Sequence, residues 1–174
     1  MKSLRSLFRI GLGPSSSHTM GPNRAAKIFA ERCPEVDSYR VTLYGSLAAT
    51  GEGHMRDVAL KTVLEPIAKL ELIWEAETFL PFHPNGMLFE ALKSGEVMDQ
   101  WTIYSIGGGN IASPEMPQLA GEKVYPITTA EEILAWCDRE GKSWWEYVQD
   151  CEGDEIWPYL EMIWETMCRT IDNG

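Results

Sequence analysis

The chain has 174 residues, of which 44% are hydrophobic and 24% charged, a balance typical of a soluble globular protein and unlike that of a disordered one. Its net charge is −11, and residues 129–174 carry three basic against twelve acidic side chains, which argues against a nucleic-acid partner because phosphate binding needs clustered basic residues. Charges interrupt every apolar stretch well before ~18 residues, which excludes a membrane span. Because the first residues also lack the pattern of a signal peptide, we expect a cytoplasmic protein.

Cysteine spacing argues against a metal centre built by this chain alone. The four cysteines, Cys33, Cys137, Cys151 and Cys168, form no Cys-x-x-Cys pair. Without a secretory signal we expect them to be reduced thiols, most of them buried among apolar residues.

The first part of the chain predicts an alternation of helices and strands. Pro22 followed by an alanine-rich apolar stretch predicts a helix that ends before Pro34. Residues 40–44 alternate and are partly β-branched or aromatic, which predicts a strand closed at Gly45. Residues 56–64 have the apolar spacing of a helix.

Further strands are predicted in the middle of the chain. Residues 86–92 and 100–106 read as strands, the second running into a glycine triplet, and residues 122–126 read as a short further strand. Together these elements predict an α+β fold, with a mixed or antiparallel sheet and flanking helices.

The last part of the chain predicts almost continuous helix. Thr129-x-x-Glu132 and Ser143-x-x-Glu146 are capping-box patterns, and Gly141 is placed to end the first of these helices. Apolar residues then recur at helical steps of three and four: Ile156, Leu160, Ile163, Met167 and Ile171.

Five of the seven tryptophans lie in this helical part, at positions 136, 144, 145, 157 and 164. We interpret them as packing surface, in part against another chain or domain. The change in character predicts a domain at residues 1–128 followed by a helical segment at residues 129–174.

All three histidines, His18, His54 and His83, lie in loop-like stretches rich in Gly, Pro or Ser, where polar groups commonly serve function. Asp57 follows His54 by three residues and would orient its imidazole as a general base. The alternative is a histidine and an aspartate that face solvent at a helix N-terminus.

The most unusual stretch is the run of hydroxyls at residues 15–17 that leads into the predicted helix. Side-chain hydroxyls and free backbone amides at a helix start suit a carboxylate or a phosphate. The alternative is a loop with redundant helix N-caps. Likewise, Gly107–Gly109 either presents backbone donors to a ligand or only connects a hairpin.

Four stretches in order closely resemble the iron–sulfur-dependent L-serine dehydratases, also called L-serine ammonia-lyases. Residues 6–22 read Ser-Leu-Phe-Arg-Ile-Gly-Leu-Gly-Pro-Ser-Ser-Ser-His-Thr-Met-Gly-Pro. Residues 44–48 read Tyr-Gly-Ser-Leu-Ala, with Thr-Gly-Glu-Gly-His at residues 50–54. Residues 83–87 read His-Pro-Asn-Gly-Met, and residues 104–109 read Tyr-Ser-Ile-Gly-Gly-Gly.

The resemblance covers roughly residues 5–112 and implies that the chain is the β portion of such an enzyme. It implies a fold similar to the allosteric substrate-binding domain of some phosphoglycerate dehydrogenases. The iron–sulfur cluster, expected to be 4Fe-4S, would belong to an α portion absent from this sequence, and no pyridoxal phosphate is involved. The chain alone would therefore be inactive. We expect the α portion, on the same or another chain, L-serine and a second copy of the enzyme as partners.

The resemblance also implies the chemistry. The open iron of the cluster acts as Lewis acid, the Cα proton of L-serine is removed, and the β-hydroxyl leaves. The resulting aminoacrylate becomes iminopyruvate and hydrolyses to pyruvate and ammonia.

Site residues carry over onto the matching positions, with His54 as the candidate base and Asn85 as a hydrogen-bond partner of the substrate. The substrate carboxylate would be bound by five consecutive residues: Ser15, Ser16, Ser17, His18 and Thr19. Supporting roles would fall to Asp57, His83, Gly107 and Gly108. Two alternatives stay open: a regulatory module that binds serine or a related small acid without chemistry, and a scaffold whose helical end mediates assembly.

Overall fold

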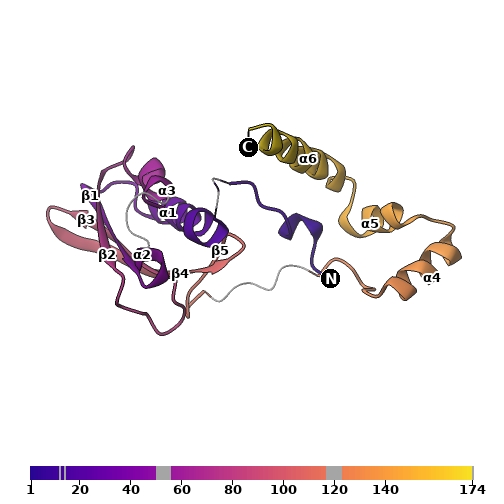
Figure 1. The fold of residues 1–174 in the computed structure, drawn as a ribbon, viewed down its shortest axis with the longest axis horizontal. Coiled ribbons are helices and arrows are strands. Elements are labelled where there is room, and N and C mark those ends of the chain that lie inside the picture. The colour runs from indigo at the N-terminus through magenta and orange to yellow at the C-terminus, as the bar shows by residue number, and fades with distance from the viewer. Residues whose placement is uncertain (12, 14, 50–55, 117–122, 174) are drawn as a thin grey trace. The chain divides into compact units, whose positions relative to one another are not determined.

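The computed structural model describes residues 1–11, 13, 15–49, 56–116 and 123–173. The chain divides into two compact units, Gly11–Leu119 and a second unit made of Met1–Ile10 with Ala120–Gly174 (Figure 1). The division into a domain at residues 1–128 and a helical segment stays a prediction, and the compact units group the first ten residues with the C-terminal helices.

The larger unit is built on a five-stranded mixed sheet, which confirms the predicted α+β class. The strand order is β2-β1-β3-β4-β5, where β1 pairs in parallel with β2 and all other neighbours are antiparallel. The strands are β1 (Ser38–Tyr44), β2 (Lys69–Glu75), β3 (Gly86–Lys93), β4 (Glu96–Gly107) and β5 (Asn110–Ala112).

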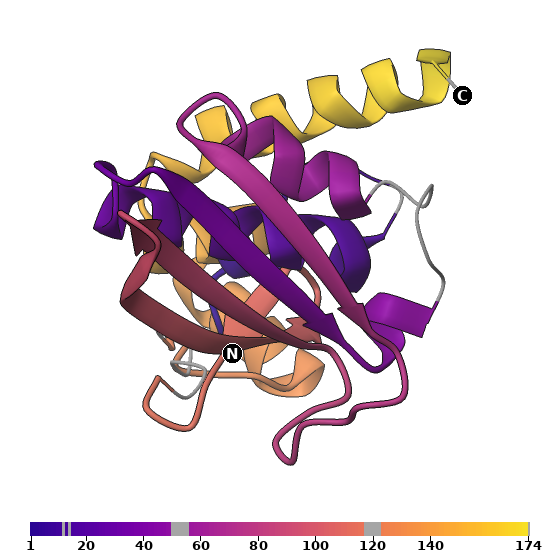
Figure 2. The ribbon, with the colours of Figure 1, turned by 90° about the vertical axis from the view of Figure 1, so that its left-hand side faces the viewer.

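Helices of this unit cover one face of the sheet, and in Figure 2 they are the indigo and purple coils behind the strands. A π-helical turn, η2 (Ser16–Met20), runs directly into α1 (Gly21–Arg32), whose N1/N2 proline confirms the predicted helix start. A short helix, α2 (Ser46–Ala49), follows β1, and α3 (Arg56–Leu64) confirms the second predicted helix.

The core of this unit lies between α1, α3 and the sheet. Phe29 of α1 is fully buried and contacts the rings of Tyr39, Phe89 and Trp101, with centroids 6.1, 5.4 and 6.5 Å away. Each such buried aromatic side chain contributes about 1.5–3 kcal/mol through burial of its apolar surface.

Two differences from the predicted elements have clear physical reasons. The expected strand at residues 122–126 is wrong: the described part of that stretch forms one isolated bridge, between Lys123 and Lys2, and Pro126 has no amide hydrogen to extend it. The sequence did not predict β2, although a turn with Pro66 precedes it, because its parallel partner β1 is distant in sequence. It also did not predict the short elements α2 and β5.

The second unit is helical, with η1 (Leu4–Ser6), α4 (Ala130–Glu140), α5 (Trp144–Glu152) and α6 (Ile156–Asn173). Its helix ends confirm the predicted signals: Thr129 caps α4, Ser143 and Glu146 form a capping box, and Gly141 adopts the left-handed conformation that ends α4. Among the described helices of both units, none is long and apolar enough to cross a membrane.

The core of the second unit is small. Its buried cluster consists of Tyr125, Ile133, Cys137 and Tyr147. Along α6 the predicted apolar stripe is buried at Ile156 and Ile163. At Ile171 the same stripe is 75% exposed.

Candidate functional site

The hydroxyl-rich turn lies at the start of a long helix, as predicted. Ser15 is the N-cap of the π-helical turn, and its hydroxyl accepts a hydrogen bond from the His18 amide at 3.2 Å. The N-cap interpretation therefore holds for Ser15. π-Helical turns are rare and occur frequently at functional sites, and this one continues directly into α1.

The imidazole of His18 joins two of the four sequence motifs. Its Nδ1 lies 2.9 Å from Ser17 Oγ, and its Nε2 lies 3.2 Å from Ser46 Oγ in α2. Because both ring nitrogens are engaged, the ring is held in one orientation. The sequence motifs around residues 18 and 46 thus meet through one side chain.

The remaining two motifs meet at Ser105 and Asn85. The fully buried Ser105 hydroxyl of β4 donates to the Ser17 carbonyl at 2.6 Å. Asn85 Nδ2 donates to the Ser105 carbonyl at 3.2 Å, and the Ser105 amide donates back to the Asn85 carbonyl at 3.0 Å. His83 Nδ1 accepts from the Asn85 amide at 3.1 Å, which fixes the ring against the start of β3.

Two glycines permit these contacts because a side chain would occupy the same space. A Cβ on Gly21 would lie 2.1 Å from Ser105 Oγ, so the helix backbone packs directly on that hydroxyl. Gly45 has a φ of +50°, and a Cβ there would lie 2.7 Å from the Pro84 carbonyl oxygen. All four motifs therefore pack into one polar cluster, which we call the serine–histidine cluster: Ser15, Ser17, His18, Ser46, Asn85 and Ser105.

Thr19 stands out beside this cluster. Its side chain is fully buried, and its hydroxyl has no hydrogen-bond partner among the described residues, whereas Ser16 is exposed. Buried polar atoms are almost always paired, so an unpaired hydroxyl next to a polar cluster is what a ligand site would contain.

Asp57 lies in the first turn of α3. Its Oδ2 accepts from Lys61 Nζ at 3.2 Å, and its buried Oδ1 has no partner within the described ranges. Burial acts to raise the pKa of Asp57, but the hydrogen bonds from Lys61 and backbone amides, with the Lys61 charge, outweigh it, so its pKa lies below the usual range. His54 lies outside the described residues, and its pairing with Asp57 stays a prediction.

The glycine triplet forms the connection between β4 and β5. Gly107 pairs with Asn110 across the hairpin, and Gly107 and Gly108 have φ values of +94° and +58°. This backbone conformation requires glycine, which agrees with the hairpin interpretation. A role for these glycines toward a ligand stays a prediction.

Ser46 and Ser105 are members of the cluster that sequence reasoning did not single out. Both lie inside stretches that carry the family resemblance, and that position was the one signal that could have identified them. Serines are too common for composition or periodicity to distinguish these two.

The described residues do not fit an iron–sulfur cluster. No group of three or more His, Cys, Asp or Glu side chains is arranged to hold a metal ion within the part of the chain that the structure describes. The four cysteines are free thiols, and Cys33 lies in a different compact unit from the other three.

Comparison with known proteins identifies similar sequences. A family model described as the serine dehydratase beta chain matches residues 3–69 and 61–116. L-serine dehydratase 1 of Escherichia coli K12 is 34% identical over all of this chain and 49% of the relative. L-serine dehydratase of Helicobacter pylori 26695 is 32% identical over 99% of the chain and 48% of the relative.

A third relative, L-serine dehydratase of Mycobacterium tuberculosis CDC 1551, is 33% identical over 79% of the chain and 39% of the relative. The chain thus spans about half the length, or less, of these curated relatives. The family match includes every residue of the serine–histidine cluster.

Proposed function

This chain belongs to the serine dehydratase beta chain family, and from that membership we propose that it is the β portion of an L-serine ammonia-lyase, which converts L-serine to pyruvate and ammonia. The observation that carries the proposal is the meeting of four separated motifs at the serine–histidine cluster. Ser17, for example, accepts from a hydroxyl 88 positions away. Evolved binding sites commonly draw polar groups from several loops placed on a rigid scaffold.

The turn at residues 15–19 is the proposed site of the substrate carboxylate. It combines the N-terminus of a long helix with several hydroxyls, and both features favour an anion. Ser16 is exposed there, and the Thr19 hydroxyl is without a partner among the described residues. His18 and Ser105 hold the backbone of the turn in place.

The proposed reaction needs a base and a leaving group. His54, oriented by Asp57, would take the Cα proton, and the β-hydroxyl would leave as water, which gives 2-aminoacrylate. Tautomerisation to the imine, addition of water and loss of ammonia then give pyruvate, so one water leaves and one returns. Because the described residues do not fit an iron–sulfur cluster, we place that cofactor in the enzyme's other portion.

The first test is anaerobic pyruvate release from L-serine by this chain joined to its native downstream sequence or partner. His54→Ala is expected to lower the rate of pyruvate release about 10²–10⁴-fold, as loss of a general base typically does, while the absorbance of the iron–sulfur cofactor stays unchanged. Asp57→Asn is expected to lower kcat less, because it removes only the orienting carboxylate.

A near wild-type rate in His54→Ala would contradict the catalytic role. The domain would then be a binding or regulatory module, and the base would have to lie in the other portion. Loss of both activity and iron–sulfur absorbance in His54→Ala would instead indicate a damaged holoenzyme. In that case Asp57→Asn is the informative variant, because a lower kcat with unchanged iron–sulfur absorbance would still indicate a defect in proton transfer.

A second expectation concerns the chain alone. Purified without the other portion and free of metal, it should release no pyruvate from L-serine, and turnover by that preparation would overturn the division of labour proposed here. We also propose a cytoplasmic enzyme that assembles with its α portion and as a homodimer.

A further inference from the structure

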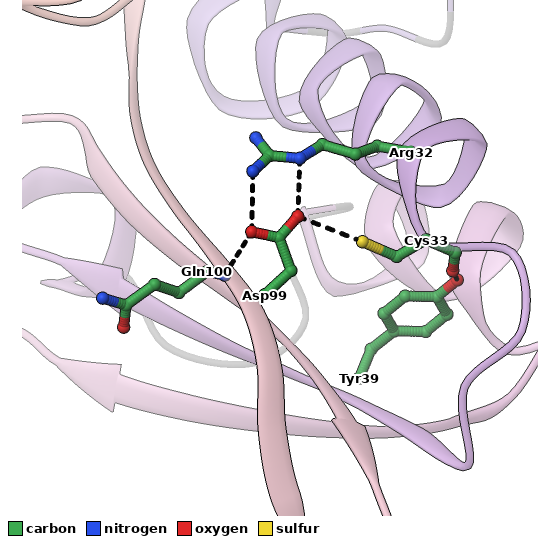
Figure 3. Close-up of polar contacts among 5 residues, drawn as sticks. All are labelled: Arg32, Cys33, Tyr39, Asp99 and Gln100. Carbon is green, nitrogen blue, oxygen red and sulfur yellow. Dashed lines mark hydrogen bonds and ion pairs between the residues drawn. The ribbon is translucent and has the colours of Figure 1, made fainter.

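A second polar contact joins α1 to β4 at the opposite end of the helix (Figure 3). Arg32 binds Asp99 through two nitrogens, with Nη2 2.6 Å from Oδ1 and Nε 2.5 Å from Oδ2. The Cys33 thiol donates to the same carboxylate at 3.3 Å. A two-pronged arginine–carboxylate pair is directional as well as attractive, so it fixes the position of the helix end and not merely its proximity.

The Cys33 thiol keeps the proton that it donates to Asp99. Burial first, and then the hydrogen bond and charge of Asp99, raise the pKa of Cys33 to about 11. At neutral pH the thiol therefore stays protonated. The Tyr39 hydroxyl donates to the Cys33 carbonyl, which holds the chain where it leaves α1.

A β-bulge turns Asp99 toward the helix. Ala91 pairs with Asp99 but Leu92 pairs with Val97, so the register shifts and Met98 is the extra residue. Bulges re-aim the side chains beside them. From Asp99 onward, alternate residues of β4 share one face of the sheet, and they are Asp99, Trp101, Ile103 and Ser105.

That face of β4 matches α1 from end to end. Ser105 bonds the Ser17 carbonyl, Trp101 stacks on Phe29 at 6.5 Å, and Asp99 pairs with Arg32. At α-helical rise, the stretch from Ser17 to Arg32 would extend about 22 Å, and somewhat less because Ser16–Met20 is a π-helical turn. From Asp99 to Ser105 a strand extends about 20 Å. Helix and strand therefore run antiparallel over similar lengths, with a polar contact at each end and apolar packing between.

We infer that Asp99 is a positioning residue, which fixes α1 lengthwise along β4 and thereby holds the Ser15–Thr19 turn against Ser105. Apolar packing such as Phe29 on Trp101 is not directional and tolerates a small slide of the helix. The turn end is held by the hydrogen bonds from Ser105 to Ser17 O and between His18 and Ser46, and Asp99 adds a directional contact at the other end of the helix. The predicted effect on KM for L-serine rests on the proposed function, whereas the predicted effect on the position of the turn does not.

The test uses this chain joined to its native downstream sequence or partner, with Asp99→Ala compared with wild type. Glu71→Ala is the matched control, because it breaks the Arg40–Glu71 ion pair at 2.9 Å on the same sheet but between β1 and β2. Asp99→Asn keeps the shape of the side chain and guards against a variant that fails to fold.

Hydrogen exchange reports the turn itself. The amides of Thr19 and Met20 both donate to the Ser15 carbonyl. In Asp99→Ala their exchange is expected to accelerate about fivefold or more, whereas Glu71→Ala leaves it unchanged. In the active enzyme, Asp99→Ala is expected to raise KM for L-serine about three- to tenfold with kcat within about twofold. Asp99→Asn should move both quantities in the same direction by less.

The inference is overturned if exchange at Thr19 and Met20 in Asp99→Ala equals that in Glu71→Ala, or if exchange rises while KM stays at the wild-type value. A wild-type enzyme that makes no pyruvate would refute the proposed function instead. The exchange comparison would still decide whether Asp99 positions the turn.

Discussion

The two compact units differ in what holds them together. In Gly11–Leu119, sixteen of the described residues form one buried apolar cluster between the helices and the sheet, and the serine–histidine cluster lies beside it. In the second unit the buried cluster has four members, and helix capping and side-chain hydrogen bonds are prominent. A site that depends on fixed distances therefore lies on the unit with the larger core.

The largest expected effect is on the core of the larger unit. Phe29→Ala should lower its free energy of unfolding by about 3–5 kcal/mol, because a fully buried ring is lost and a cavity remains. Urea titration followed by peptide-resolved hydrogen exchange measures this loss for each unit separately. Leu134→Ala, at a 50% exposed position of α4, is the control, and we expect a change below about 0.5 kcal/mol. If Phe29→Ala and Leu134→Ala lowered the free energy of unfolding equally, the larger unit would not depend on its core as described.

A smaller effect is expected where α1 packs on Ser105. Gly21→Ala places a Cβ 2.1 Å from Ser105 Oγ, and the resulting strain should cost about 1–3 kcal/mol and raise KM for L-serine. Gly13→Ala is the matched control, since nothing lies within 4 Å of its added Cβ. Calorimetry and pyruvate release on both variants measure the difference. If Gly21→Ala behaves like Gly13→Ala, the close approach does not constrain the site.

In the second unit, one carboxylate ties the N-terminal segment to α5. Glu152 accepts from Ser3 Oγ and the Leu4 amide, both at 2.6 Å, and from Tyr125 Oη at 2.8 Å. Burial acts to raise the pKa of Glu152, but these hydrogen bonds lower it more, and its pKa lies below the usual range. Glu152→Gln should therefore cost this unit about 1 kcal/mol at neutral pH.

This stabilisation has a defined pH dependence. A carboxylate with a depressed folded pKa stabilises the fold fully above its unfolded value of about 4.3, and that contribution is lost as pH falls through the lower folded value. The difference between wild type and Glu152→Gln in urea should accordingly shrink below about pH 4.3. A difference that persists undiminished at pH 2, or one that the exposed Glu155→Gln reproduces, would contradict this assignment.

The smallest stability effect is expected at Thr19. Thr19→Val keeps the shape of the side chain and removes a buried hydroxyl that lacks a partner among the described residues, so stability should stay equal or rise by up to about 1 kcal/mol. If the hydroxyl binds substrate, KM for L-serine rises in the same variant. A clear loss of stability would show that the hydroxyl has a structural partner in the free enzyme.

Local signals in the sequence were sufficient for most helices and three strands. The helix after Pro22, the capping boxes and the stop at Gly141 involve interactions within about four residues, so their patterns can be recognised along the chain. The wrongly predicted strand at residues 122–126 shows where local signals fail. A strand needs neighbouring strands to pair with, and residues suited to a strand do not show that such neighbours exist.

The site depended on tertiary structure in a different way. The motifs around residues 15–19 and 83–87 were evident from the sequence as candidates, but Ser46 and Ser105 became site residues only when the sheet placed them beside His18 and Ser17. The same holds for the parallel pairing of β2 and for the pair of Asp99 with Arg32, which lie 67 positions apart. Such contacts between residues far apart in sequence are decided by how the sheet and helices pack, because closing these long loops costs entropy that burial of the core offsets and no local pattern does.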